Sequence, residues 1–327
     1  MTLTTDPTRQ GRDQADPVIR PPIRGVSPVL EVPFTDDGTV DVDGFERVVR
    51  YVIDCGVESM MFPGYASEFL KLTESERRTL DQVLLSHTRQ RDDIAAVCAV
   101  QDHSTIVATR HAAALVEAGA DAINLLAPYQ LGPSMTDIQE HVRAVCAAVA
   151  PVTVVLQYAP EQTGGSLTAG TIAAISRDRP NLRMVKVEVT PPGPFIHELG
   201  RQDPALPAAV GYAGVQLPDA WRRGAAGVQP GCSFTEIYMR IWRLHAAGDD
   251  SAAVDLHRRL LPYISYWMSG SELIVAAEKL ISFRRGLFGS AYCRRPAHLL
   301  DSEEVAMVNR FLEEFADLLP DLHGALA

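Results

Sequence analysis

The chain has 327 residues, enough for one large α/β domain or for a barrel with an appended region. Its formal net charge of −11 argues against nucleic acid or an anionic membrane as the main partner, and no apolar run reaches the roughly 18 residues of a membrane span. The five cysteines are widely spaced and odd in number, which favours reduced thiols in a cytoplasmic protein over a disulfide framework.

Residues 1–20 are polar and lack the apolar segment of a signal peptide, so a disordered N-terminal tail is predicted there. From Gly25 onward, short apolar segments alternate with amphipathic ones. The segments expected to be strands are Val26–Val32, Ser59–Phe62, Ile94–Val100, Ala122–Leu126, Val152–Tyr158, Leu182–Val189, Ala208–Gly211 and Gly227–Gln229.

Helical patterns lie between these strands. The first follows an apolar stripe from Phe45 to Ile53, and the second opens with a capping box, Thr73 to Glu76. Eight strand–helix units in succession predict a (β/α)₈ TIM barrel over about residues 21–232. The fold typically needs about 250 residues, so the chain is long enough for it. A doubly wound sheet is the alternative, which is weakened because Pro33–Gly38 stands where a Gly-rich phosphate loop is expected.

No strand pattern recurs after Gly231, and residues 233–327 are predicted to form a C-terminal helical region. Its helical segments are Thr235–Ala247, Ser251–Met268, Glu272–Leu287 and Glu303–Leu319. The last segment carries a continuous apolar stripe from Val305 to Leu319. The stripe is interpreted as support for a homo-oligomer, a tetramer or a dimer, with packing on the chain's own barrel as the alternative.

Lys186 occupies the middle of the predicted strand Leu182–Val189 and is one of only three lysines in the chain. Strand alternation places Lys186 and Glu188 on one face and the intervening valines on the other. Burial lowers the pKa of a lysine and leaves a nucleophilic neutral amine, so Lys186 is a candidate for Schiff-base chemistry. A solvated lysine at a strand end is the alternative. Lys71 and Lys279 are expected to be ordinary solvated lysines.

The chemistry of a TIM barrel lies at the C-terminal ends of its strands. Tyr158 ends the strand before that of Lys186, and the two are expected to face the barrel mouth together as a proton shuttle and a nucleophile. The other candidate substrate-binding residues at strand ends are Tyr65, Ala66, Ser67, Tyr129, Gln130, Glu188, Tyr212 and Gln229. The histidines lack metal-ligand spacing, so neither a metal nor another cofactor is expected.

Several stretches resemble the dihydrodipicolinate synthase/N-acetylneuraminate lyase family of class I aldolases and dehydratases. Gly64–Phe69 is similar to the family's Gly-x-x-Gly-Glu loop, Tyr158-Ala159-Pro160 to its Tyr-Asn-x-Pro segment and Val185-Lys186 to its Schiff-base strand. The resemblance runs from about residue 21 to the end. It implies that Lys186 attacks the keto group of a 2-oxo acid, such as pyruvate or a 2-oxo-3-deoxy sugar acid, with Tyr158 as general acid/base.

The chain departs from the family's pattern at three places. Tyr65 and Ala66 replace two small hydroxyl residues that bind the substrate carboxylate, and Ser67 replaces the second glycine of that loop. Gln130 stands where dihydrodipicolinate synthases carry a second tyrosine, and Glu161-Gln162 stands where they carry an arginine. These changes favour a divergent lyase over dihydrodipicolinate synthase proper. A family member with altered catalysis and a binding or regulatory role is the alternative.

Overall fold

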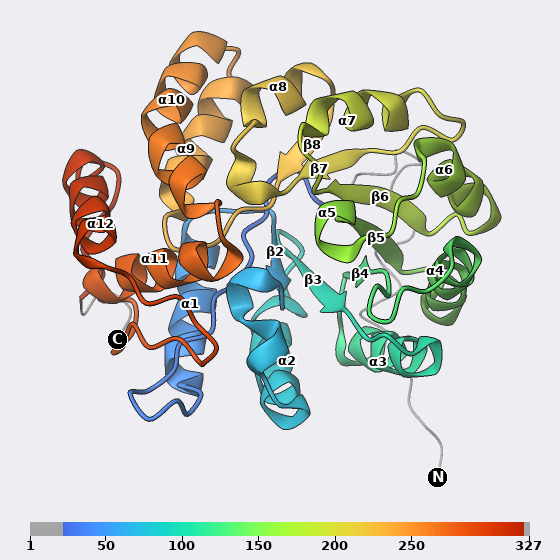
Figure 1. Cartoon of the computed structure of the whole chain (residues 1–327), viewed down its shortest axis with the longest axis horizontal. Coiled ribbons are helices and arrows are strands. Elements are labelled where there is room, and N and C mark those ends of the chain that lie inside the picture. Colours follow the sequence, from blue (N-terminus) through green and yellow to red (C-terminus); the bar gives the residue numbers. More distant parts are fainter. Residues whose placement is uncertain (1–21, 324–327) are drawn as a thin grey trace.

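The computed structural model describes residues 22–323, so the predicted tail at residues 1–20 lies outside the described residues. Eight parallel strands form one sheet in the order β1-β8-β7-β6-β5-β4-β3-β2, with helices around it (Figure 1). The predicted TIM-barrel fold is confirmed. The strands are β1 (Gly25–Val26), β2 (Ser59–Phe62), β3 (Ala95–Val100), β4 (Ala122–Leu126), β5 (Thr153–Tyr158), β6 (Leu182–Val187), β7 (Ala208–Val210) and β8 (Ala225–Val228).

The barrel closes between β1 and β2 through an isolated bridge that pairs Val29 with Met61. Two backbone hydrogen bonds support this junction: Leu30 N–H donates to the Met61 carbonyl at 2.9 Å, and Met61 N–H donates to the Pro28 carbonyl at 2.8 Å. The first strand was expected to run from Val26 to Val32, but its regular ladder covers only two residues. Beyond Val26 the pairing continues irregularly, since Ser27 N–H donates to the Val228 carbonyl at 2.9 Å and Val29 N–H to the Pro230 carbonyl at 2.7 Å. Pro28, between them, has no N–H to donate toward β2.

The helices that follow the strands match the predicted segments closely. Helix α2 has the predicted capping box, in which Thr73 and Glu76 exchange side-chain and backbone hydrogen bonds. The elements around the barrel are α1 (Val42–Asp54), η2 (Tyr65–Ser67), η3 (Phe69–Lys71), α2 (Glu74–Thr88), α3 (Thr105–Ala118), α4 (Met135–Val149), α5 (Pro160–Thr163), α6 (Ala169–Asp178), α7 (Pro192–Gly200), η4 (Tyr212–Gly214) and α8 (Leu217–Arg222).

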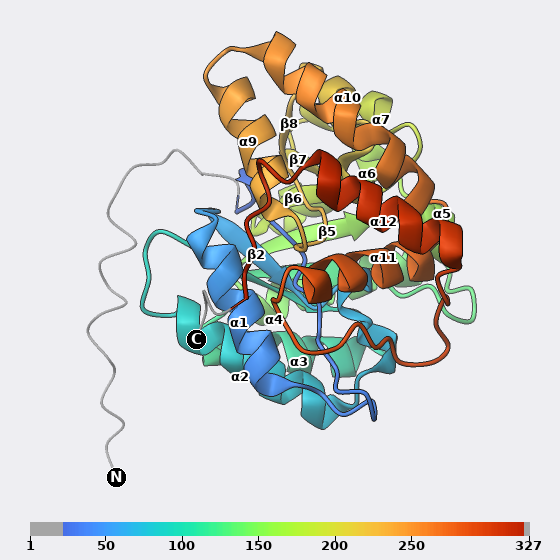
Figure 2. The ribbon, with the colours of Figure 1, turned by 90° about the vertical axis from the view of Figure 1, so that its left-hand side faces the viewer.

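The C-terminal helices gather on one side of the barrel, in orange and red in Figures 1 and 2. They are α9 (Thr235–Ala246), α10 (Asp250–Trp267), α11 (Ser271–Arg284) and α12 (Ser302–Glu314). Helix α11 contacts η2 at the barrel mouth. Helix α12 ends five residues before the predicted end at Leu319, where Pro320 disfavours a helical conformation of the residue before it. No helix within residues 22–323 is long and apolar enough to cross a membrane.

The apolar stripe of α12 packs within its own chain. Val308, Phe311 and Phe315 are fully buried, and Phe311 lies 5.1 Å from the ring of Phe234 and 5.3 Å from that of Trp267. The stripe therefore belongs to the monomer's core. It gives no reason of its own to expect an oligomer, and that part of the interpretation is corrected.

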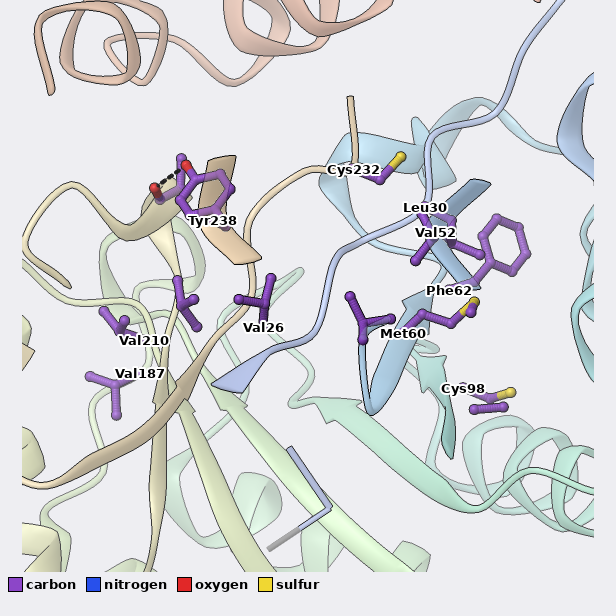
Figure 3. Close-up of a cluster of buried hydrophobic side chains, with 14 of the residues drawn as sticks. Val26, Leu30, Val52, Met60, Phe62, Cys98, Val187, Val210, Cys232 and Tyr238 are labelled. Carbon is purple, nitrogen blue, oxygen red and sulfur yellow. Dashed lines mark hydrogen bonds between the residues drawn. The ribbon is translucent and has the colours of Figure 1, made fainter. Parts of the chain in front are cut away.

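The core has two layers that follow the alternation of the strands. The outer layer fills the space between sheet and helices, and Figure 3 shows Met60 and Phe62 of β2 in this layer near Val52 of α1. The inner layer fills the barrel itself with small and medium apolar side chains: Ile23, Val29, Met61, Val97, Ala99, Ala122, Val155, Met184 and Ala209. A polar side chain on the inward face therefore has apolar neighbours inside the barrel and is accessible only from the mouth.

Candidate active site

A cavity of about 80 Å³ lies at the C-terminal ends of the strands, between the barrel and the C-terminal helices. One water needs about 10–15 Å³ on this measure, so the cavity has room for a small organic acid. Its lining residues are Val29, Tyr65, Ala66, Gln162, Lys186, Glu188, Tyr212, Ala213, Gln229, Pro230, Gly231, Met268, Ser271, Ile274, Val275 and Glu278. The cavity is therefore built from several strand ends and closed by α10 and α11.

Lys186 points into the barrel from β6, and its side chain is only 4% exposed. Its Nζ lies 3.4 Å from Glu188 Oε1 and 4.0 Å from the Met61 sulfur. Within residues 22–323, the Glu188 carboxylate is the one charged group that the amine contacts. The cavity lies beside the amine, so a ligand has access to it. The predicted interior position of Lys186 is confirmed, and a solvated lysine at a strand end is excluded.

Glu188 belongs to a row of inward-facing polar side chains from three neighbouring strands. Asn124 of β4 donates its amide to Gln157 Oε1 at 2.8 Å, and Gln157 Nε2 of β5 donates to Glu188 Oε2 at 2.6 Å. Gly211 stands so close that an added Cβ would lie 2.4 Å from the Glu188 side chain. The row fixes the Glu188 carboxylate beside Lys186, and neither Asn124 nor Gln157 was singled out from the sequence.

Tyr158 does not face Lys186. The register pairs Lys186 with Gln157 and pairs Tyr158 with Val187, so Tyr158 points outward into the layer beneath the helices. Its ring stacks on Phe195 of α7 at 4.5 Å, and its hydroxyl lies 3.4 Å from that of Ser166. The expected pairing at the mouth is wrong because strand alternation turns Tyr158 away. Counted back from Pro160, the Tyr-Asn-x-Pro segment places its tyrosine at Gln157.

The loop after β2 supplies two of its three predicted residues to the cavity. Tyr65 and Ala66 line it, and burial raises the pKa of the Tyr65 phenol far above its usual range. Ser67 is fully buried, accepts a hydrogen bond from Gly64 N–H at 2.9 Å and donates its hydroxyl to the Leu30 carbonyl. Its hydroxyl holds the loop against the barrel and is not among the groups that line the cavity.

Two more predicted residues line the cavity on its β7–β8 side. Tyr212, which has a left-handed φ of 50°, bonds through its hydroxyl to Gln162 Nε2 and, at 3.1 Å, to Glu161 Oε2. Gln229 donates to the Ser27 hydroxyl at 3.2 Å. Burial raises the pKa of Tyr212 to about 12, so its phenol is neutral at physiological pH.

Two of the predicted substrate-binding residues lie outside the cavity lining. Tyr129 and Gln130 belong to the loop after β4, where Tyr129 is half-buried near Tyr65 and Gln130 is exposed. The cavity lining therefore does not support the prediction that Tyr129 and Gln130 bind substrate.

The wall contributed by α11 carries an acidic residue that sequence reasoning missed. Glu278 is 3% exposed, and its Oε1 has no hydrogen-bond partner among residues 22–323. Behind it lies Glu31, which is 1% exposed and accepts a hydrogen bond from Ser282. Burial raises the pKa of Glu31 to about 7 and that of Glu278 well above its ordinary value, and the proximity of Glu31 raises the latter further. The signal was an acid that, together with Lys279, separates the apolar run Leu273–Ala277 from Leu280 and Ile281.

Lys279, expected to be solvated, is 1% exposed. Its ammonium pairs with Glu68, donates to the Tyr292 carbonyl at 3.0 Å and lies 4.0 Å from the centre of the Phe34 ring. Lys71 pairs with Glu68 at 3.0 Å and with Glu272 at 2.5 Å. Both expectations of ordinary solvated lysines are therefore wrong, because Glu68 draws the two ammonium groups to the base of α11.

The cysteines form no disulfide, and Cys232 is fully buried with the pKa of its thiol raised by burial. Within residues 22–323, no group of three or more histidine, cysteine or acidic side chains is arranged to hold a metal ion.

Comparison with known proteins places the chain in a family. The model of the dihydrodipicolinate synthetase family matches residues 22–315. The 4-hydroxy-tetrahydrodipicolinate synthase of Methanothrix thermoacetophila is 27% identical over 317 residues, covering 91% of this chain and 99% of that protein. The corresponding enzyme of Chlorobium luteolum is 32% identical over 164 residues, so that match spans 50% of this chain and only about half (54%) of the relative.

Among solved structures, dihydrodipicolinate synthase from Rhodopseudomonas palustris superposes with a TM-score of 0.81 at 24% identity, covering 89% of this chain and 97% of that one. At this identity the likeness shows the fold alone, whereas the family model covers nearly the whole chain. The chain belongs to the dihydrodipicolinate synthetase family.

Proposed function

We propose that the protein is a Schiff-base-forming lyase, an aldolase or a dehydratase, that acts on a 2-oxo acid such as pyruvate or a 2-oxo-3-deoxy sugar acid. The observation that carries the proposal is the position of Lys186: a buried amine, held by one carboxylate at 3.4 Å, that opens into a cavity of about 80 Å³. Family membership supports a lyase of this class.

The Lys186–Glu188 pair supplies what imine formation first requires. A lysine attacks a carbonyl only as a neutral amine, and Glu188 is close enough to accept the proton that the ammonium must lose. The hydrogen bond from Gln157 holds the Glu188 carboxylate at this place. The imine then acts as an electron sink for making or breaking a bond at the neighbouring carbon.

The carboxylate of the 2-oxo acid is expected to bind backbone N–H groups of the loop after β2. Tyr65 and Ala66 are the first residues of the short helix η2, where N–H groups have no acceptor within the helix. Ser67 is not available, since its hydroxyl already bonds to the Leu30 carbonyl. This arrangement retains one carboxylate site without the pair of hydroxyl residues found in the family.

A second carboxylate finds no cation in the cavity. Lys186 is the only basic residue of the lining, whereas Glu188 and Glu278 are acidic and Gln162 stands at the position of the family's arginine. A charge-assisted hydrogen bond contributes roughly 1.5–3 kcal/mol, and its absence disfavours a dicarboxylate or aspartate semialdehyde as the partner. A neutral polyhydroxy or apolar aldehyde fits better, and dihydrodipicolinate synthesis is not the proposed reaction.

Borohydride reduction with a panel of 2-oxo acids tests the proposal. Intact mass should show one adduct per chain with pyruvate, and peptide mapping should locate it at Lys186. A coupled reductase assay with pyruvate and aspartate semialdehyde should show no appreciable turnover. Absence of any adduct across the panel would contradict the lyase assignment, and efficient turnover of aspartate semialdehyde would contradict the proposed specificity.

A binding or regulatory role is the second candidate, favoured by one observation: Gln157 occupies the place next to Lys186 where the family motif has its tyrosine. An amide cannot shuttle a proton. An adduct that forms with pyruvate but exchanges no C3 protons with solvent, and gives no product with any aldehyde, would favour this role over the lyase.

A homo-oligomer, a tetramer or a dimer, is part of the proposal. Large apolar side chains are exposed in neighbouring parts of one face: Leu131 in the loop after β4 is 97% exposed, and Ile106 and Val107 of α3 are 58% and 48% exposed. Helix α3 packs against α4, the helix that follows the loop of Leu131. Light scattering at micromolar concentration should give a multiple of 35.6 kDa, and Leu131→Asp should shift the protein toward the monomer.

A further inference from the structure

The carboxyl group of Glu278 is aimed into the cavity of Lys186 from the opposite wall. Both residues line the cavity, Lys186 from β6 and Glu278 from α11. A Cβ added at Gly231, which also lines the cavity, would lie 1.8 Å from Glu278 Oε2, so the glycine makes room for this carboxyl. Lys186 and Glu278 thus border the same small cavity from the barrel and from the helix that covers it.

The surroundings of Glu278 favour its protonated, uncharged form. It is completely buried, its Oε1 has no hydrogen-bond partner among the described residues, and the nearest carboxyl behind it is Glu31. Cys232 and Ser282 bond to Glu31, and the ammonium of Lys279 is engaged by Glu68. From α9, Tyr238 faces Glu278 with its hydroxyl donated to the Ala213 carbonyl. Burial, and then repulsion by Glu31, raise the pKa of Glu278 well above its ordinary value, which favours the protonated carboxyl.

We propose that Glu278 is the catalytic acid–base residue of this site, which gives and takes the protons of the reaction at the imine of Lys186. The proposal rests on the lyase function proposed above. Among the described residues, the site otherwise lacks a group suited to proton transfer beside the imine. Tyr158, which was expected to shuttle protons, points away from the cavity, and the amide of Gln157 is not an acid or a base.

The other ionisable groups of the lining are less suited to this task. Glu188 is held by Lys186 and Gln157 and serves the amine itself. Tyr212 is held by Glu161 and Gln162, and burial raises the phenol pKa of both Tyr212 and Tyr65 far above neutrality. A carboxyl whose pKa is shifted upward toward neutrality comes closest to the match that general acid–base catalysis needs.

The proton balance is as follows. Lys186 gives one proton to Glu188, its amine forms the C–N bond to C2 of the 2-oxo acid, and a second amine proton moves to the former oxo oxygen to give a carbinolamine hydroxyl. Glu278 donates its proton to that hydroxyl, the C–O bond breaks and water leaves a protonated imine. The Glu278 carboxylate then takes a proton from C3, whose C–H electron pair forms the enamine, and Glu278 is neutral again.

Exchange of the C3 protons of pyruvate with D₂O, followed by ¹H NMR, measures this proton transfer without an aldehyde partner. Glu278→Gln should lower the exchange rate by about 10²–10⁴. Borohydride should still trap the imine at Lys186 in that variant after long incubation. Glu278→Asp, which keeps a carboxyl, should exchange faster than Glu278→Gln.

Glu272→Gln is the matched control, since Glu272 lies on the same helix, outside the cavity lining, and its side chain is 44% exposed. It should exchange at the parent's rate. Exchange in Glu278→Gln within about threefold of the parent, with trapping intact, would overturn the role of Glu278 and leave the lyase function standing. Failure of the parent protein to trap or exchange any 2-oxo acid would overturn both. If Glu278→Gln does not fold, Glu278→Asp decides: exchange slower than the parent's with trapping intact supports the proposal, and exchange at the parent's rate contradicts it.

Discussion

Two buried lysines, Lys186 and Lys279, each pair with a glutamate, but the rest of their surroundings differ. Lys279 is enclosed by the Glu68 carboxylate, the Tyr292 carbonyl and the Phe34 ring, and it does not line the cavity. Lys186 has one carboxylate at 3.4 Å, the Met61 sulfur at 4.0 Å and otherwise the cavity. Burial alone therefore does not distinguish a reactive lysine from a structural one.

The distinction lies in how many of the ammonium's donors are satisfied. An ammonium has three N–H donors, and Lys279 has a partner for its charge, a carbonyl acceptor and an aromatic face. Among the described residues, Glu188 is the only one whose oxygen lies close to the Lys186 ammonium, and the cavity lies beside it. Lys279 fastens α11 to the loop after β2, whereas Lys186 is held in place by the row of β4–β6 side chains and stays available for chemistry.

Substituting Lys186 tests the difference between the two lysines most directly. Lys186→Ala should abolish borohydride trapping of pyruvate, because no other lysine lines the cavity. Its unfolding midpoint should stay near the parent's, since the cavity can admit water to the freed Glu188. Intact mass after reduction measures the first effect and denaturant unfolding the second. Persistent trapping would assign the nucleophile to Lys71 or Lys279.

Substituting Lys279 should lower the stability of the protein and leave imine trapping intact. Lys279→Met removes one of the two lysine ion pairs that the buried Glu68 carboxylate makes within residues 22–323, and breaking a buried pair costs about 3–5 kcal/mol of unfolding free energy. Imine trapping at Lys186 should persist at temperatures where the variant is folded. Urea unfolding checks the stability, and loss of trapping in a folded variant would show that Lys279 takes part in the chemistry.

The buried carboxyl of Glu31 should make the stability of the protein depend on pH. The pKa of Glu31 is raised from 4.5 to about 7, so the folded state holds its proton more tightly than the unfolded chain. Its contribution to stability is therefore greatest below pH 4.5 and falls as pH rises to about 7, by about 3 kcal/mol in total. Glu31→Gln should remove this fall. Unfolding free energies between pH 5 and 8 measure it, and an unchanged pH dependence would contradict the prediction.

The smallest effect is expected for Tyr158. Tyr158→Phe should change C3 exchange of pyruvate by less than about threefold, because the hydroxyl lies in the outer layer, 3.4 Å from Ser166. Gln157→Leu, one residue away, should slow imine formation by about 10- to 100-fold, since it removes the hydrogen bond that holds Glu188 and leaves Asn124 without its acceptor. A larger loss in Tyr158→Phe than in Gln157→Leu would restore the tyrosine to the mechanism.

Much of this site follows from strand alternation in the sequence. The segments Ser59–Phe62 and Ala122–Leu126 are strands with the predicted bounds. The inward position of Lys186 in β6 and of Glu188 just after it follows from their spacing of two residues. The error at Tyr158 has a single cause: the segment before Pro160 is one residue shorter than the family motif, and one residue reverses the face of a strand. Aligning on the proline would have placed Gln157 beside Lys186.

The burial of the charged residues of α11 could not be predicted from the local sequence pattern. Whether Glu278 and Lys279 lie in water or in the interior depends on where the helix docks, and residues more than 200 positions earlier, Glu68 and Glu31 among them, decide it. Periodicity within a helix identifies a face but not the surface that covers it. The interruption of an apolar run by two charged residues was visible, and only the fold shows that both are buried.

The junction between β1 and β2 has a consequence for the motions of the protein. It is joined by an isolated bridge, whereas β5 and β6 pair along five positions. Sub-global opening starts where backbone pairing is sparsest, so amide protons at Leu30 and Met61 should lose hydrogen-exchange protection before those of β5 and β6. Val29 lines the cavity and Met61 touches the Lys186 amine. Fluctuations of this junction therefore open the wall of the cavity itself, and a ligand bound to Lys186 rigidifies the least protected closure of the barrel.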